Sequence, residues 1–199
     1  MDYYPIIADS FQNTIETIAM SVDDLAGAIA AGSQLMTGAL LADRKIIVCG
    51  NGVDAAVAQL FACNLLGRFE QDRPALPALS LAADNASVTA IAQSGAFNDI
   101  FSRQLRALGQ AGDVLLCISS GEGASNLLRA VQTAQERDMA VIAMTSTRDS
   151  TLSAVIRPED VELRVNAMRQ ARVVEMHTMA IHSFCALIDH SLFGSHDLE

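Results

Sequence analysis

Two loops that contain glycine, each directly after an apolar stretch, have the composition of an anion-binding site. The first is residues 50–54, and the second is residues 119–125. A loop that opens into a helix presents backbone N–H groups and the positive end of a helix dipole to a phosphate. The candidate ligand is a weakly bound sugar phosphate, and the candidate binding residues are Asn51, Gly52, Asp54, Ser119, Ser120 and Glu122.

Asp54 and Glu122 oppose this chemistry, because each puts a carboxylate into a loop expected to hold an anion. A carboxylate about 4 Å from a phosphate charge costs on the order of 4 kcal/mol at an effective dielectric of 20. That is roughly a thousandfold in affinity. Asp54 is expected to cap its own helix, and Glu122 to lie at the positive end of another helix dipole. Two interpretations stay open: the acids replace the bound anion, or they bind a cation or a basic ligand.

The elements that must position these loops alternate between strand and helix from residue 45 onward. Short apolar runs predict strands at 45–49, 75–81, 113–119, 139–145 and 161–165. Helices are expected at 54–68, 85–94, 97–108, 122–137 and 168–193. This alternation predicts an α/β fold, a three-layer α/β/α sandwich with a five-stranded parallel sheet. In such sheets ligands bind beyond the carboxyl ends of the strands.

The segment that precedes this alternation has a helical pattern of its own. Gly27 and Gly32 weaken its far end, so a second short helix is expected around residues 35–41. Its apolar residues alternate at spacings of four and three, as in a coiled-coil seam: Phe11, Ile15, Ile18, Val22, Leu25 and Ile29. We expect this seam to contact another subunit. The expected organisation is one domain over 1–199, with 1–42 as a helical oligomerisation segment and 43–199 as the α/β core and C-terminal helix.

Composition narrows the possible functions further. The formal net charge is −10, and an acidic surface repels phosphate backbones, so direct nucleic-acid binding is not expected. Neither a membrane span nor a signal peptide is apparent, which favours the cytoplasm. The cysteines form no CxxC pair and are expected to be reduced core thiols: Cys49, Cys63, Cys117 and Cys185.

Five stretches carry a family resemblance over nearly the whole chain. They are CGNG (49–52), NLLGRFEQDRP (64–74), FNDIFSRQLRALGQAGDVLLCIS (97–119), VEMH (174–177) and LIDHSLF (187–193). On these stretches the sequence resembles the sugar isomerase (SIS) domain proteins of the phosphoheptose isomerase group. Within that group it is most similar to a subgroup that associates with the replication initiator DnaA. The resemblance implies a flavodoxin-like SIS domain and a homotetramer.

The group also implies an aldose–ketose isomerisation of sedoheptulose 7-phosphate, which needs a carboxylate base, a histidine and often a metal. On this sequence, the group's first His, its catalytic Glu and its Gln fall on Leu60, Asn64 and Val174, and only its second His is retained, as His182. Leucine and valine offer no lone pair to a metal, and a carboxamide takes up no proton at neutral pH. We therefore expect no metal cofactor and an inactive site at His182 and Asn64.

Several polar residues have simpler expected roles. His177 is expected to form a satisfied polar pair with Glu175. Arg73, in the turn before the second strand, is expected to pair with Glu70 or Asp72. Both expectations are structural and imply no catalysis.

The end of the closing helix has two open interpretations. The subgroup resemblance implies that Leu192 and Phe193 contact DnaA, but the same pair would also serve as a core anchor. The favoured function is a non-catalytic homotetrameric scaffold that binds DnaA. The alternatives are D-sedoheptulose 7-phosphate isomerase and a sensor of a non-phosphorylated or nucleotide sugar.

Overall fold

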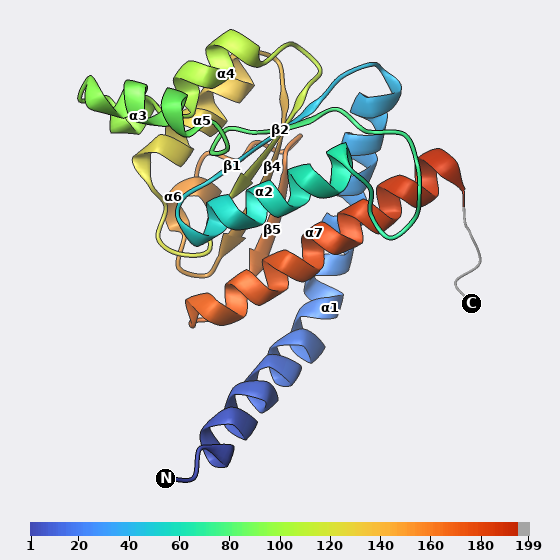
Figure 1. The fold of residues 1–199 in the computed structure, drawn as a ribbon, viewed down its shortest axis with the longest axis vertical. Helices are drawn as coiled ribbons and strands as arrows, with labels where there is room; N and C mark the ends of the chain where they lie inside the picture. The colour runs from blue at the N-terminus through green and yellow to red at the C-terminus, as the bar shows by residue number, and fades with distance from the viewer. Residues whose placement is uncertain (195–199) are drawn as a thin grey trace.

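The computed structural model describes residues 1–194, and within them five parallel strands form the central sheet (Figure 1). The strands are β1 (Ile46–Gly50), β2 (Ala78–Ser80), β3 (Val114–Ile118), β4 (Ala140–Ser146) and β5 (Val161–Val165). They lie in the order β2-β1-β3-β4-β5, and each neighbouring pair is parallel. The order reverses between β1 and β3, and such a switch point leaves a crevice at the carboxyl ends of the two strands.

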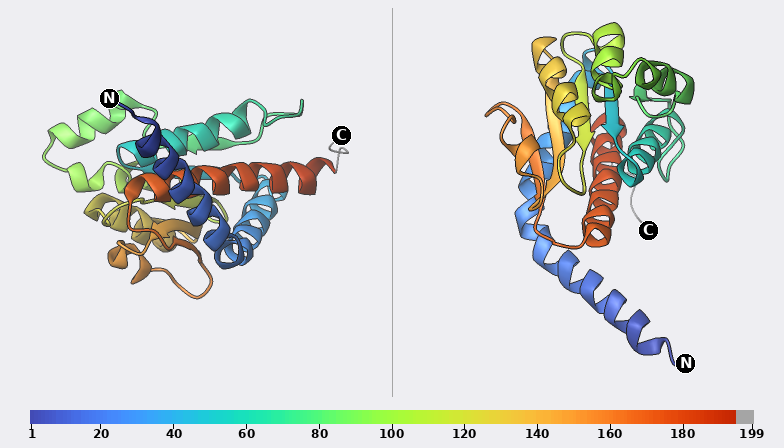
Figure 2. Two further views of the ribbon diagram at one scale, coloured as in Figure 1. Left: turned by 90° about the horizontal axis from the view of Figure 1, so that it is seen from below. Right: turned by 90° about the vertical axis from the view of Figure 1, so that its left-hand side faces the viewer.

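Helices cover both faces of this sheet, which confirms the three-layer sandwich (Figures 1 and 2). One face carries α1 (Tyr4–Leu41), α2 (Val53–Leu66) and α7 (Gln170–Phe193). The other carries α3 (Asn85–Gln93), α4 (Ser102–Leu108), α5 (Ser125–Glu136), α6 (Ser150–Ser153) and a 3-10 turn at Phe97–Asp99. No helix within residues 1–194 is both long and apolar enough to cross a membrane.

Two hydrophobic cores lie on the two sides of the sheet. Ile46 and Val48 of β1 point toward α1, α2 and α7, whereas Ile47 and Cys49 point toward the other helical layer. This alternation follows from the two-residue period of a strand. A strand covered on both faces is apolar at every position, and this explains the uninterrupted runs in β1 and β3.

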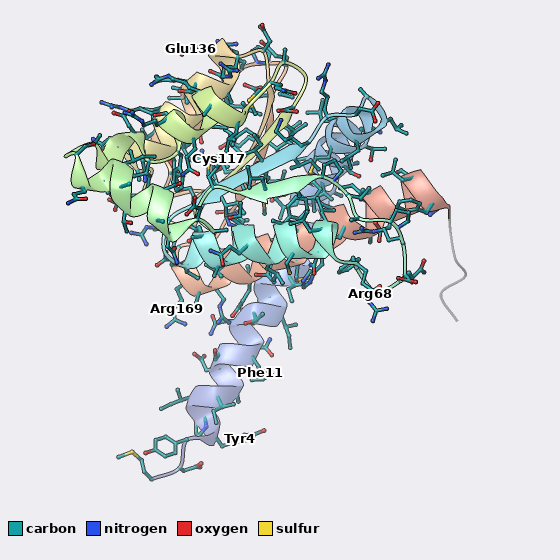
Figure 3. The ribbon with its side chains drawn as sticks, turned by 45° about the horizontal axis from the view of Figure 1, so that its top comes forward. Tyr4, Phe11, Arg68, Cys117, Glu136 and Arg169 are labelled. Atoms are coloured by element: carbon teal, nitrogen blue, oxygen red, sulfur yellow. The ribbon has the colours of Figure 1, made fainter. Side chains whose placement is uncertain are left out.

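The N-terminal segment is one helix of 38 residues, so the expected break near Gly27 and Gly32 is wrong. A Cβ atom at Gly32 would lie 2.9 Å from the ring of Phe184, so this glycine lets α1 pack closely on α7. The first half of α1 extends away from the sandwich, with Tyr4 and Phe11 on the projecting part (Figures 1 and 3). Of the predicted seam, Leu25 is buried, whereas Phe11 and Ile15 are 69% and 57% exposed.

Other predicted boundaries also shift. The second strand is confined to Ala78–Ser80, because Pro77 has no N–H group for the ladder and offers only its carbonyl, to Ile46. The helix expected at 97–108 divides into the 3-10 turn and α4, and the helix expected from residue 122 begins at Ser125. Helix α6 was not predicted. All four cysteines are free, but Cys63 is exposed, so it is not a core thiol.

Arg73 joins the end of α2 to α7, and the expected pairing with Glu70 or Asp72 is wrong. Its Nε donates to Asp189 Oδ1 at 2.7 Å, and its terminal nitrogens donate to the carbonyls of Leu65 at 2.9 Å and Asn64 at 2.7 Å. The Arg73 side chain is 3% exposed. It therefore satisfies the Asn64 carbonyl, which the last turn of α2 leaves free, and shares the Leu65 carbonyl with the backbone N–H of Leu76.

We expect Arg73→Met to lower the free energy of unfolding by about 2 kcal/mol, because Asp189 loses its ion-pair partner and the Asn64 carbonyl loses its donor. Urea denaturation would measure this change. Arg68→Met is the matched control, because Arg68 is exposed and its removal should change stability by no more than about 0.5 kcal/mol. Equal effects from the two substitutions would contradict the role given to Arg73.

Candidate functional site

The candidate site lies where β1 and β3 end, between the loop that enters α2 and the loop that enters α5. Gly52 adopts φ 55° and ψ −118°, a conformation essentially restricted to glycine. At Gly50 a Cβ atom would lie 2.7 Å from the carbonyl of Asp54. These two glycines therefore allow the first turn of α2 to fold tightly against the end of the strand.

Asp54 connects the two loops, and the expectation that it caps its own helix is wrong. Its Oδ2 accepts a hydrogen bond from the backbone N–H of Ser120 at 2.9 Å, while α2 begins after Gly52 with no side-chain cap. Burial raises the pKa of Asp54, and the hydrogen bonds from Ser120 offset part of that rise. The carboxylate thus accepts an N–H group that would otherwise be free to bind an anion.

Ser119 and Ser120 of the second loop form hydrogen bonds within the protein. Ser119 Oγ donates to Asp149 Oδ2 at 2.6 Å, and Ser120 Oγ accepts from Gln170 Nε2 at 3.1 Å. Both serines and Asp149 are buried. Ser119 therefore directs its proton to a carboxylate, and not toward a ligand in the cleft.

Asn51 pairs with Asn126 across the same crevice. Asn51 Nδ2 donates to Asn126 Oδ1 at 2.9 Å, and Asn126 Nδ2 donates to Asn51 Oδ1 at 2.8 Å. This reciprocal amide pair connects the first loop to the first turn of α5. Each amide keeps a second N–H group and a second lone pair for other partners.

Glu122 does not lie on the end of a helix dipole, because α5 begins three residues later, at Ser125. Its side chain is exposed and lies 3.4 Å from Arg148 Nη2. Glu122 therefore lies at the exposed edge of the cleft, whereas Asp54 lies in its buried part.

The cleft between these loops has a volume of about 380 Å³. Four residues of the site were not foreseen: Asn126, Arg148, Asp149 and Gln170. The last three follow the carboxyl ends of β4 and β5, so the rule that identified the first two loops would have found them if applied to every strand. The lining residues include Asn51, Asp54, Ser119, Glu122, Arg148 and Gln170.

Comparison with known proteins identifies the family of this arrangement. A family model described as the SIS domain matches residues 10–146. The chain belongs to the SIS domain family. It is 41% identical over 195 residues to the phosphoheptose isomerase of Chromohalobacter salexigens, covering 98% of this chain and 99% of that one. It is 43% identical over 183 residues to the DnaA initiator-associating protein DiaA of Pectobacterium carotovorum, covering 92% of this chain and 93% of that one.

Solved structures agree with this assignment of the SIS-domain protein. The phosphoheptose isomerase of Francisella tularensis has a TM-score of 0.91 at 35% identity, over 96% of this chain and 100% of that chain. The corresponding protein of Neisseria gonorrhoeae has a TM-score of 0.89 at 37% identity, over 94% of this chain and 99% of that chain. The predicted family and fold are thereby confirmed, with relatives that bear either of two functional names.

The four positions that the family resemblance assigns to catalytic groups lie outside this cleft in the SIS-domain protein. Leu60 and Asn64 lie one turn apart on α2, and Val174 and His182 lie on α7. None of the four lines the cleft between the loops. His182 is exposed and stacks on Phe69, with ring centroids 5.7 Å apart.

His177 is a buried residue of this SIS-domain protein, and the expected pair with Glu175 is wrong. Its Nε2 lies 3.2 Å from the carbonyl of Thr145, and its Nδ1 has no hydrogen-bond partner within residues 1–194. Glu175 pairs instead with Arg172 at 2.7 Å. Burial lowers the pKa of His177 to about 4, so the ring is neutral at neutral pH.

Leu192 and Phe193 differ in burial, and this bears on the two roles expected for them, core anchor and partner contact. Leu192 packs against the core beneath α7. Phe193 is 40% exposed at the end of the helix. Phe193 is therefore the more exposed of the two residues and the better placed to contact a partner.

Proposed function

We propose that this SIS-domain protein is a non-catalytic homotetrameric scaffold of the cytoplasm that binds the replication initiator DnaA and retains a degenerate sugar-phosphate cleft. The observation that carries the proposal is the chemistry of Leu60, Asn64 and Val174. They occupy the positions that the family resemblance assigns to a histidine, a glutamate and a glutamine. An enediol mechanism needs a base there, and none of the three side chains can take up a proton.

The zinc ion implied by the isomerase group does not fit these residues. Leu60 and Val174 have no donor atom, which leaves one imidazole and one carboxamide, whereas a catalytic zinc site uses three protein ligands. Within residues 1–194 no group of three or more His, Cys, Asp and Glu side chains is arranged to hold a metal ion. We therefore assign no step to a metal.

The cleft between the loops also argues against turnover of a phosphorylated sugar. The carboxylate of Asp54 holds the Ser120 N–H, and the Ser119 hydroxyl is held by Asp149. A phosphate at this point would meet a buried negative charge and would find two of its expected donors already bound.

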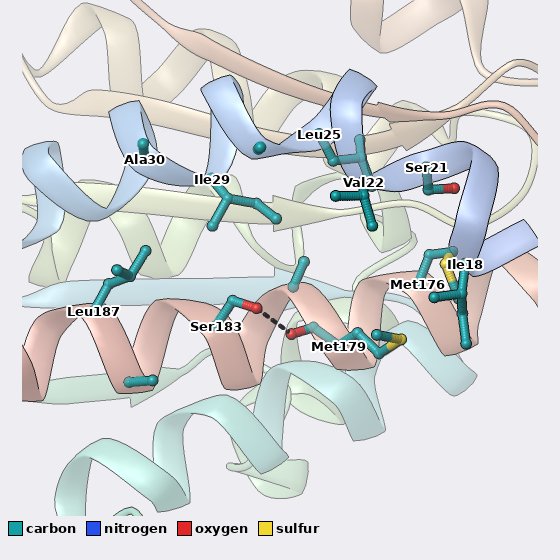
Figure 4. A pocket seen from close by; sticks show the side chains of 13 residues that line it. Ile18, Ser21, Val22, Leu25, Ile29, Ala30, Met176, Met179, Ser183 and Leu187 are labelled. Atoms are coloured by element: carbon teal, nitrogen blue, oxygen red, sulfur yellow. Dashed lines mark hydrogen bonds between the residues drawn. The ribbon is translucent and has the colours of Figure 1, made fainter. Parts of the chain in front are cut away.

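The helices supply the surfaces that a scaffold needs. A groove of about 560 Å³ separates α1 from α7 and is lined mainly by apolar side chains such as Val22, Leu25, Ile29 and Met179 (Figure 4). Together with the exposed half of α1, this groove favours contact with further copies of the chain. Several copies in one assembly present several equivalent Phe193 side chains, which raises apparent affinity for an oligomeric partner.

We expect Phe193→Ala to weaken DnaA binding by about tenfold or more, since exposed aromatic residues are frequent hot spots of interfaces. Surface plasmon resonance with immobilised DnaA would measure the change. Leu108→Ala is the control, because Leu108 is a 44% exposed apolar residue at the end of α4. No binding by the native protein, or unchanged binding by Phe193→Ala, would count against this interface.

The second candidate function is phosphoheptose isomerase, favoured by the exposed and accessible His182. A coupled assay with sedoheptulose 7-phosphate, with and without added zinc, separates the two functions. We expect no turnover above background in either condition, with a complete isomerase as the positive control. Turnover that His182→Ala abolishes would overturn the scaffold proposal in favour of the enzyme.

A further inference from the structure

A groove of about 720 Å³ lies between α3 and α4, beside the edge strand β2. These helices cover the face of the sheet opposite to α1, α2 and α7 (Figure 1). The groove shares no lining residue with the cleft after β1 and β3. Its volume lies within the range of small-molecule pockets. It is therefore a separate hollow, which the scaffold function does not use.

Apolar side chains that the fold covers incompletely face this groove. No residue of α3 is buried, and Leu108 of α4 is 44% exposed. Leu79 and Ile91 are only partly buried against the core of this layer. An apolar ligand in the groove removes such surface from water, which is favourable roughly in proportion to the area covered. The same ligand would give α3 a packing partner.

One charge in the groove is not already paired within the protein. Arg103 is the only cation among the lining residues, is exposed and forms no salt bridge within residues 1–194. The only lining acid, Asp84, is the N-cap of α3, and its Oδ1 accepts from the backbone N–H groups of Ala86 and Ser87 at 3.1 Å each. The positive end of the α3 dipole offsets the charge of Asp84.

Two other polar residues of the lining use their hydrogens inside the protein. Gln104 Nε2 donates to the carbonyls of Leu81 at 3.0 Å and Ile100 at 2.8 Å, and Ser87 Oγ donates to Asp84. A sugar would therefore find few donors here, whereas a guanidinium offers two parallel N–H groups to a carboxylate. One arginine neutralises one charge, so a monocarboxylate suits a protein of net charge −10 better than a doubly charged phosphate does.

We propose that this groove binds an amphipathic monocarboxylate, a small molecule with one carboxylate and an apolar chain. The carboxylate pairs with Arg103, and the chain lies against Leu79, Ile91 and Leu108. Binding buries apolar surface of α3 and α4 and holds the two helices together. It depends neither on DnaA association nor on the loops after β1 and β3.

Isothermal titration of the full-length protein with octanoate, octanol and octylamine, at one pH and one salt concentration, tests the proposal. We expect octanoate to bind about tenfold or more tightly than either of the others, because only octanoate forms charge-assisted hydrogen bonds with the arginine. Arg103→Gln should reduce the affinity for octanoate to that for octanol. Arg106→Gln is the matched control, since it removes the same charge from an exposed residue of α4 that does not line the groove.

A second variant tests the apolar part of the groove. Ala107 lines the groove and is exposed, so Ala107→Phe should fill part of the hollow and weaken the binding of both octanoate and octanol. The proposal is overturned if octanoate does not bind, if it binds no more tightly than octanol, or if a folded Arg103→Gln variant keeps the native preference. It is also overturned if Leu108→Asp dissociates the assembled protein, because another copy then covers the groove. The DnaA measurement is separate, so failure here leaves the scaffold proposal standing.

Discussion

The double substitution Phe11→Asp, Ile15→Asp should dissociate the assembled protein and weaken self-association at least a hundredfold. Both side chains project from the half of α1 that leaves the sandwich, and they are 69% and 57% exposed in the isolated chain. Burial of such a side chain in an interface contributes about 1.5–3 kcal/mol. Two of them therefore account for more than a hundredfold in the dissociation constant of each contact.

Sedimentation velocity over a range of protein concentrations would measure this loss. Leu108→Asp provides the control, because it places the same charge on an exposed apolar residue in the opposite helical layer. That variant should sediment like the native protein. If the native chain is a monomer at micromolar concentration, or if the double variant assembles normally, the exposed half of α1 is not the contact.

Acidification from pH 6.5 to pH 4 should destabilise the protein by roughly 3 kcal/mol through His177 alone. Burial holds the pKa of His177 at about 4 in the folded state, against 6.5 as the ordinary value. Between these two values the unfolded chain binds a proton that the folded chain does not, so stability falls as the pH falls through this window. Each unit of difference corresponds to about 1.36 kcal/mol.

Urea denaturation at several pH values between 4 and 7 would show this slope. His177→Gln should flatten it, whatever that substitution does to stability at pH 7, because glutamine does not titrate. His182→Gln is the control, since His182 is exposed, and it should leave the slope as in the native protein. A slope that survives in His177→Gln would assign the acid sensitivity to other groups.

The alternation of strands and helices could be predicted because each type of element has a recognisable pattern of apolar residues over a short stretch of sequence. Buried parallel strands read as short apolar runs, and the strands of the central sheet follow them closely. The predicted strand boundary was wrong where a backbone group is missing. Pro77 has no N–H group, and β2 is therefore shorter than predicted. The predicted break in α1 was wrong because Gly32 serves close packing of α1 on Phe184. Helix propensity, which counts glycine as a weak helix former, contains no information about that contact.

The position of the candidate site could be predicted from the sequence, but the hydrogen bonds within it could not. The loops after β1 and β3 were identified from residue types, whereas the partner of Asp54 lies 66 residues away in another loop. Helix-capping preferences depend only on nearby residues, so they predicted that Asp54 caps its own helix and could not predict its hydrogen bond with Ser120. The same limit applies to Arg73, whose partner Asp189 is 116 residues distant and is reached only because α2 and α7 lie side by side.

In the proposed assembly, the projecting half of α1 would link the order of a segment to the abundance of the protein. Before Ser10, which accepts a hydrogen bond from Arg172 at 2.6 Å, the helix has no side-chain bond to another element within residues 1–194. A short helix without packing is marginal in water. Its helical population therefore rises with whatever covers it, and dilution removes that cover by mass action. If the chain assembles as proposed, the protein concentration would set what fraction of this segment is helical, without a ligand or a modification.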